Sequence, residues 1–280
     1  IYANISTNSN KITKLHEERK KQEYDGYWGY SSGSYYYTEG LSRYTYFGNK
    51  YAGVYNEETY ALTGDAAYDP AKGGLAMYYK NVYKTDADGN VMKDENKAKI
   101  VEKVIATTTY SEADQYVGED MLAKAFGGFG TGFQYKGFDL SVDFQYQIGG
   151  KVYDGEYQTL MGGMAGYGFH TDVLNAWTPE NSGSNIPRFQ ASYTGMTSSS
   201  DRWLTSASYL TLGNITFGYT LDKKILKSAH IESARLYFVA DNIYTWSKRK
   251  GLDPRQSLTG GSNGQMYSPI RTFSCGVNIV

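Results

Sequence analysis

The sequence is poor in cysteine and has no long hydrophobic run. Cys275 is the only cysteine among the 280 residues, which excludes an internal disulfide framework and a zinc site built from several cysteines. No run of about 18 apolar residues occurs, and the mean hydropathy is −0.55, so a bundle of transmembrane helices is excluded. The net charge of −1 gives no reason to expect nucleic-acid binding.

Motifs for catalysis or metal binding are also scarce. The histidines lie far apart with no carboxylate at ligand spacing, no Gly-x-Ser-x-Gly motif occurs, and no Cys–His pair is indicated. Residues 86–95 fit a calcium loop only loosely, because Lys84 would take the first ligand position, so we expect a hairpin turn at Asp86–Asn90. We therefore expect no enzyme, no cofactor and no metal site.

Tyrosine and a strict alternation of side chains are abundant instead. The chain has 29 Tyr, and every second residue from Phe138 to Ile148 is apolar or aromatic while those between are polar. A period of two predicts a strand with one apolar and one polar face. Repeated strands of this kind predict an all-β fold, a transmembrane antiparallel β-barrel segment whose outside meets lipid and whose lumen meets water.

The same pattern predicts the other elements. Roughly eight to ten strands are expected, including residues 1–15, 75–83, 129–135, 138–148, 201–221, 234–243 and 271–280. Residues 24–55, rich in Tyr, Gly and Ser, suit strand ends and extracellular loops. Long loops are expected at 149–202, with short helices at 155–164 and 171–176, and at 246–264. Short turns are expected at Lys136-Gly137 and Lys223–His230.

The last third of the chain has a distinctive order of elements. Ser208–Trp246 is predicted to form a strand, a short basic turn and a second strand that ends in aromatic residues. YSPIRTFSCGVNIV (Tyr267–Val280) is predicted to form the last strand. These segments resemble the C-terminal barrel portion of the SusC-like proteins, a family of TonB-dependent outer-membrane transporters. Further similar segments extend the resemblance over nearly the whole chain: Asn8–Leu15, Tyr51–Val54, Gly127–Met161 and Asn175–Arg188.

The resemblance implies that residues 1–280 are an incomplete part of a single barrel domain of about 22 strands. The family's plug and TonB box have no counterpart in the sequence, so we expect the chain to be the downstream piece of a longer protein. It would act in the outer membrane of a Gram-negative cell, in active import of oligosaccharides or peptides. Its implied partners are outer-membrane lipid, the remaining barrel and plug, the TonB complex acting through the plug, and a SusD-like surface lipoprotein as lid.

Two expectations concern topology. Residues 149–202 and 246–264 would lie outside the cell, with the two short turns on the periplasmic side. Ile1–Leu15 and Arg271–Val280 would pair with strands outside this chain rather than with each other, since lipid leaves no backbone group unpaired.

Two other interpretations stay open. A passive porin or structural barrel would have no plug and no TonB box. A soluble all-β glycan-binding module would expose the apolar stripes of Phe138–Ile148 and Phe273–Ile279 to water, which disfavours it.

The candidate substrate-binding residues are aromatic, because a flat ring can stack on the C–H face of a sugar. They are Trp28, Tyr30, Tyr35, Tyr36 and Tyr37, for which an interfacial belt or simple loop packing is the alternative interpretation. Cys275 is expected to be a small lipid-facing residue rather than a nucleophile.

Overall fold

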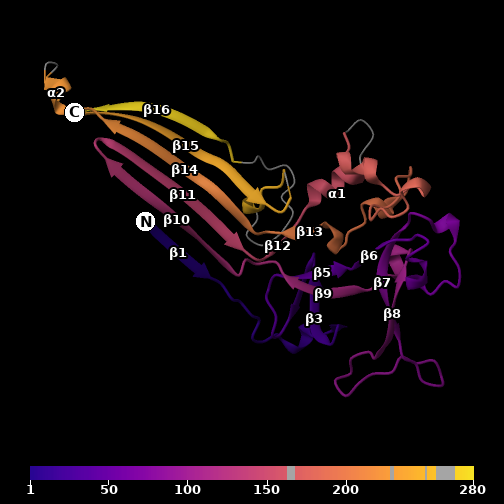
Figure 1. Ribbon diagram of the computed structural model, residues 1–280. Coiled ribbons are helices and arrows are strands. Elements are labelled where there is room, and N and C mark those ends of the chain that lie inside the picture. Colours follow the sequence, from indigo (N-terminus) through magenta and orange to yellow (C-terminus); the bar gives the residue numbers. More distant parts are fainter. Residues whose placement is uncertain (163–167, 228–229, 250, 257–268) are drawn as a thin grey trace. The chain divides into compact units, whose positions relative to one another are not determined.

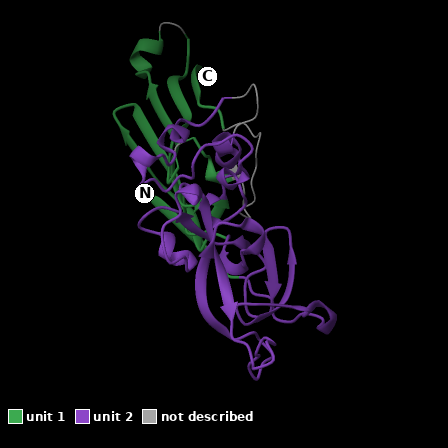
Figure 2. Ribbon diagram, turned by 90° about the vertical axis from the view of Figure 1, so that its right-hand side faces the viewer, with its two compact units in different colours: residues 1–9, 122–152, 205–280 green, residues 10–121, 153–204 purple. Residues whose placement is uncertain are grey.

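The computed structural model describes residues 1–162, 168–227, 230–249, 251–256 and 269–280. The chain forms two compact units, which Figure 2 shows in different colours. Unit 1 contains residues 1–9, 122–152 and 205–280, and unit 2 contains residues 10–121 and 153–204.

Strands dominate both units. They are β1 (Tyr2–Thr7), β2 (Gln22–Tyr24), β3 (Tyr27–Ser32), β4 (Tyr35–Thr38), β5 (Thr45–Asn49), β6 (Tyr51–Val54), β7 (Ala76–Tyr83), β8 (Val101–Thr107), β9 (Gln115–Asp120), β10 (Ala125–Tyr135), β11 (Phe138–Ile148), β12 (Lys151–Tyr153), β13 (Leu204–Ser206), β14 (Tyr209–Thr220), β15 (Ala234–Ser247) and β16 (Thr272–Ile279).

The helices are short. They are α1 (Gly155–Gly162) and α2 (Lys223–Leu226), with 3-10 turns at Glu17–Arg19, Tyr60–Thr63, Pro70–Lys72, Tyr110–Glu112, Thr171–Asn175, Pro179–Asn181, Thr194–Met196, Asp201–Trp203 and Pro254–Gln256. Across the described ranges, no helix has the length and apolar character needed to cross a membrane.

Unit 1 is built on one six-stranded antiparallel sheet, here called the large sheet. Its strand order is β1-β10-β11-β14-β15-β16, and Figure 1 shows these strands side by side. β1 and β16 form opposite edges, and among the described residues the sheet does not close into a barrel. The two terminal strands therefore do not pair with each other, in agreement with the sequence-based expectation. The expected eight to ten strands are too many for this sheet, because the strand at 75–83 (β7) pairs within unit 2 instead.

Cross-strand register gives the large sheet two distinct faces. Residues directly opposite each other share a face, and successive residues along a strand alternate between faces. Phe133 pairs with Leu140, Leu140 with Phe217, Phe217 with Phe238 and Phe238 with Cys275, so one row across the sheet is apolar throughout. The adjacent row on the other face is polar or small except for one valine: Gly132, Ser141, Thr216, Val239 and Ser274.

A β-bulge preserves these faces along β14. The apolar positions of this strand change phase between Leu212 and Ile215, which are three residues apart. The register with β11 shifts at this point, so that Gly213 is the extra residue. Because the bulge absorbs one residue, Leu212 and Ile215 both stay on the apolar face.

The connections of the large sheet differ in length at its two ends. At one end, β10 and β11 are joined by Lys136-Gly137, whose φ values of 47° and 86° suit a two-residue hairpin turn. α2 lies in the connection between β14 and β15 at that same end. At the other end, residues 8–124, 149–208 and 248–271 connect successive strands. All long connections thus leave the large sheet at one end, and all short turns lie at the other.

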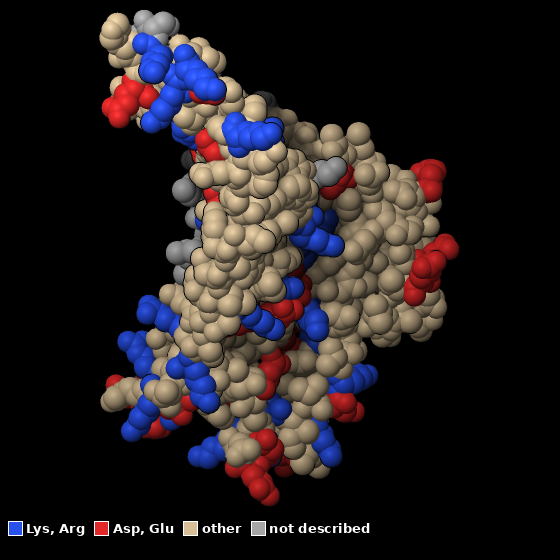
Figure 3. Space-filling model, turned by 60° about the vertical axis from the view of Figure 1, so that its left-hand side comes forward, with Lys and Arg blue, Asp and Glu red and all other residues tan. Residues whose placement is uncertain are grey.

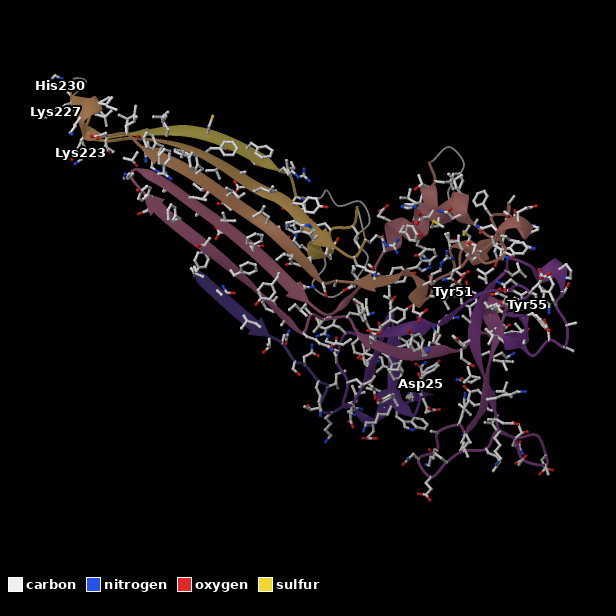
Figure 4. All side chains as sticks on the ribbon, in the orientation of Figure 1. Asp25, Tyr51, Tyr55, Lys223, Lys227 and His230 are labelled. Atoms are coloured by element: carbon white, nitrogen blue, oxygen red, sulfur yellow. The ribbon has the colours of Figure 1, made fainter. Side chains whose placement is uncertain are left out.

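Unit 2 consists of two small sheets and irregular segments. One sheet has the order β2-β3-β4-β5-β9 and the other β6-β7-β8. Its buried cores are small: Tyr55, Met77 and Ala106 form one cluster, and Trp203 packs with methionines in a second. Figure 4 labels Tyr55 just after β6.

Several predicted bounds need correction. Residues 201–221 are not one strand, since a 3-10 turn and β13, which pairs with β12, precede β14. The strand predicted at 234–243 continues to residue 247, which shortens the loop predicted at 246–264, and the strand predicted at 1–15 ends at Thr7. The predicted turn at 223–230 contains α2, and residues 228–229 lie outside the described part. The helix predicted at 155–164 spans 155–162, with its last two residues also outside it.

Candidate functional site

The apolar face of the large sheet carries side chains that are not covered by the rest of unit 1. In the row named above, Phe133 is 62%, Leu140 38%, Phe217 45% and Phe238 43% exposed. Aromatic contacts run along the face, with Phe129 stacked on Phe144 at 4.9 Å between ring centres and Phe138 beside Tyr219 at 4.4 Å. Cys275 is exposed on the same face, as the sequence predicted. An apolar surface of this extent is an interaction surface.

The polar face contains glycines that make room for larger neighbours. A Cβ at Gly130 would collide with the Tyr2 hydroxyl, and one at Gly276 would come within 2.5 Å of the Tyr237 ring. Gly132 has no such neighbour, since the nearest atom would lie 4.0 Å away. Two tyrosines therefore lie flat over glycines of the adjacent strand.

One ion pair spans a glycine on the polar face. Arg235 on β15 donates from Nε to Oδ1 of Asp139 on β11 at 2.9 Å, and its Nη2 donates to Oδ2 of the same carboxylate. Gly218 on β14 lies between the two strands, and a Cβ there would approach both side chains to 2.5 Å. The ion pair therefore requires glycine at position 218.

The aromatic residues proposed for substrate binding lie on β3 and β4 of unit 2. Tyr30 pairs with Tyr37, and their rings stack with centres 4.9 Å apart. Strand alternation puts Trp28 on the face of Tyr30, and Tyr35 on the face of Tyr37. The structure thus brings together Trp28, Tyr30, Tyr35 and Tyr37, here called the aromatic patch.

Tyr36 points to the opposite face of β4. Its side chain is fully buried, stacks on Phe47 with ring centres 5.1 Å apart, and donates its hydroxyl to backbone carbonyls of Gln22 and Tyr27 at 2.8 and 2.9 Å. Burial raises the pKa of the Tyr36 phenol above its usual value. Tyr36 is thus a core residue of this sheet and is not available to stack on a ligand.

Three neighbours of the aromatic patch were not predicted from the sequence. The Arg19 guanidinium carbon lies 5.3 Å from the centre of the Tyr30 ring, and Tyr44 contacts Tyr35 edge-on with ring centres 5.9 Å apart. The indole nitrogen of Trp28 donates to the carbonyl of Asn96 at 3.2 Å. Only the tertiary fold brings Arg19 and Asn96 to these rings, since no sequence pattern links them to β3 or β4.

Each unit also has a cavity. In unit 1, a cavity of about 550 Å³ is lined by Tyr244, Trp246 and the ion pair of Asp253 with Arg255. In unit 2, a cavity of about 460 Å³ is lined mainly by uncharged polar residues with Phe189. Neither coincides with the aromatic patch.

The residues considered for metal binding have structural contacts. Asp86 accepts hydrogen bonds from the backbone N–H groups of Asp88 and Asn90 at 3.0 and 2.9 Å, which confirms the predicted turn. These hydrogen bonds lower the pKa of Asp86, and the one from Asn90 has the largest effect. The described residues hold no group of three or more His, Cys, Asp or Glu suited to a metal ion.

No family model matches the chain, but comparison with known proteins finds similar sequences and structures. TonB-dependent receptor P3 of Formosa agariphila is 28% identical over 256 residues, which cover 86% of this chain and 22% of that receptor. TonB-dependent receptor SusC of Bacteroides thetaiotaomicron is 25% identical over 180 residues, or 61% of this chain and 16% of SusC.

Solved structures of the same class of receptor are also similar to this chain. The RagAB peptide transporter matches with a TM-score of 0.70 and 25% identity, over 99% of this chain and 26% of that chain. The RagAB peptide importer in the closed-closed state matches with a TM-score of 0.71 over the same shares. The chain spans about a quarter of the length of the first of these relatives. The sequence and fold of the chain are thus similar to part of the SusC/RagA-like TonB-dependent receptors, a family of transporters rather than enzymes.

Proposed function

We propose that the large sheet is part of the membrane-spanning wall of a TonB-dependent receptor, with its apolar face toward lipid. The observation that carries the proposal is the uninterrupted apolar row from Phe133 to Cys275, exposed on one side of β10, β11, β14, β15 and β16. The length of β11 agrees: 11 residues extend about 34 Å, and a strand tilted by about 40° rises about 26 Å. The apolar band of such barrels is about 25 Å tall.

The open edges of the large sheet are the sites where the rest of the barrel would attach. β1 and β16 each have one neighbour in the described sheet. Unpaired backbone groups in lipid cost several kcal/mol each, so both edges need strands from outside this chain. The remaining barrel and the plug inside it are therefore the first proposed partners, and residues 1–280 form an incomplete part of that one domain.

Connection length supports a defined orientation. Short periplasmic turns and long extracellular loops are the rule in outer-membrane barrels. The Lys136-Gly137 turn and α2 would then lie at the periplasmic end, and unit 2, formed within the connections 8–124 and 149–208, would lie outside the cell. Protease added to intact cells should cleave within these long connections. Cleavage confined to the α2 connection would contradict this orientation and indicate the opposite one.

The whole receptor would import nutrients actively. Its similarity to receptors named TonB-dependent supports TonB-driven transport, through a plug, rather than passive diffusion through a porin. Similarity to the RagAB peptide transporter favours peptides as substrates, and similarity to SusC leaves oligosaccharides as the second class. A SusD-like surface lipoprotein would cap the extracellular end.

Within unit 2, the aromatic patch is the proposed substrate contact. Removing two stacked rings at about 0.5–1.5 kcal/mol each should weaken binding by about 5- to 150-fold. The test is binding of a tryptic peptide mixture and of neutral oligosaccharides to the full receptor carrying Tyr30→Ala and Tyr37→Ala. Tyr27→Ala, a 40% exposed residue whose position in β3 points the other way, is the control. Equal binding by the two variants would contradict the proposal that the aromatic patch contacts the substrate.

A further inference from the structure

Basic side chains gather at the short-turn end of the large sheet. Lys136 occupies the hairpin turn between β10 and β11, and Lys223, Lys224 and Lys227 lie in and directly after α2, all exposed. Figure 3 shows Lys and Arg atoms gathered at one end of the sheet, and Figure 4 labels Lys223 and Lys227 at α2. These four residues are here called the lysine cluster.

The lysine cluster begins where the apolar face ends. The last aromatic row contains Tyr135, Phe138 and Tyr219, and the Lys136 amino nitrogen lies 5.2 Å from the centre of the Tyr135 ring. Ile225, 63% exposed, lies between the lysines of α2, whereas Leu226 beside it is buried. An apolar side chain among lysines, at the edge of an aromatic row, is the arrangement of a membrane-water interface.

The cluster has an excess of positive charge. Within the described part of the β14–β15 connection, Asp222 and Glu232 are the carboxylates, against three lysines, and Lys136 in the β10–β11 turn adds a fourth positive charge. Asp222 accepts a hydrogen bond from the backbone N–H of Lys224 at 2.9 Å, which ties its side chain to the start of α2. No ion pair of the described residues involves any of the four lysines. His230, labelled nearby in Figure 4, is also exposed.

We propose that the lysine cluster binds the phosphate groups of anionic phospholipids, with Ile225 inserted among their acyl chains. The inference rests on the proposed membrane position of the large sheet, since only then do the lysines meet a headgroup layer. Each Lys near an anionic lipid surface contributes a favourable interaction that falls off over about 10 Å in salt, so several lysines together select anionic over zwitterionic lipid. The partner is thus a phospholipid of the leaflet at the short-turn end.

The experiment uses the full-length receptor in vesicles of mixed phosphatidylglycerol and phosphatidylethanolamine. Native mass spectrometry after detergent extraction counts the phosphatidylglycerol that stays bound. We expect K223Q/K224Q/K227Q to lower the enrichment of bound phosphatidylglycerol about tenfold or more. The control K84Q/K93Q/K103Q removes three exposed lysines of unit 2 and should leave this enrichment unchanged. Undiminished enrichment in the first variant would overturn the proposal.

Three further measurements separate the possible failures. Heat-modifiable migration reports membrane insertion independently of lipid selection, so a receptor that never inserts contradicts the proposed wall function, not the lipid site. If the glutamine variant fails to fold, K223R/K224R/K227R, which keeps the charges, must retain the enrichment, and its loss would refute the proposal. Competition by soluble glycerophosphoglycerol at equal phosphate concentration would show a free-phosphate site instead and would also refute it.

Discussion

Replacing Val142 with Arg puts a charge near the middle of the proposed apolar band. Val142 pairs with Thr131 on β10 and Ile215 on β14, and it lies one residue from the midpoint of β11. One residue is about 3.4 Å along a strand, so the new guanidinium would lie close to the bilayer midplane. An Arg on the lipid face at that depth costs about 2–4 kcal/mol, which lowers the folded-to-unfolded ratio by about 30- to 900-fold.

The assay is the fraction of full-length receptor that folds into vesicles as urea is varied. Val142→Leu controls for the loss of the valine shape, and Gln145→Arg adds the same charge to the polar face of the same strand. We expect only Val142→Arg to shift the folding transition strongly. If Val142→Arg folds like the wild type while Gln145→Arg does not, the two faces have been assigned the wrong way round.

Three other predictions concern single features. Gly218→Ala should cost about 1–3 kcal/mol by crowding the ion pair that spans this position, whereas Gly132→Ala, with open space around its Cβ, should leave the urea midpoint unchanged. Trp203→Ala empties a fully buried site and should cost about 3–5 kcal/mol, seen as faster proteolysis of unit 2, and the 87% exposed Leu174→Ala should have no effect. Burial is the main cause that raises the pKa of Tyr116, and the nearby Asp201 carboxylate adds to it, so the stabilising contribution of this phenol is complete below about pH 10 and is lost as the pH rises further. Tyr116→Phe should therefore reduce the loss of unfolding free energy at alkaline pH, and an unchanged dependence on pH would contradict this.

The large sheet was predictable from the sequence wherever alternation continues without interruption. The strand at Phe138–Ile148 has the bounds that the pattern predicts, and the turn before it follows from Lys136-Gly137. The errors fall where the alternation changes phase. Asn242 has a φ of 52°, and the register between β14 and β15 shifts between the pairs Asn214–Asp241 and Leu212–Tyr244. This irregularity interrupts the alternation of β15, so the sequence pattern predicted an end at Ile243 although the strand continues to Ser247.

Unit 2 was far less predictable because its strands are short and find distant partners. β5 pairs with β9, which lies beyond β6, β7 and β8 in the sequence, and no local pattern specifies that pairing. The separation of Tyr36 from Tyr35 and Tyr37 is different, since alternation along a strand predicts it once β4 is recognised. The contacts of Arg19 and Asn96 with the aromatic patch required the tertiary structure.

The most direct test of the account compares two adjacent positions at the same depth of β16. Cys275 lies on the apolar face and Ser274 on the polar face. A nitroxide would be attached at Cys275, or at position 274 in S274C/C275S, in the full receptor with any other cysteine replaced by serine. We predict that the label at 275 collides mainly with lipid-soluble oxygen and the label at 274 with a water-soluble nickel complex. A label at 275 that collides mainly with the nickel complex would contradict the assignment of the apolar face to lipid.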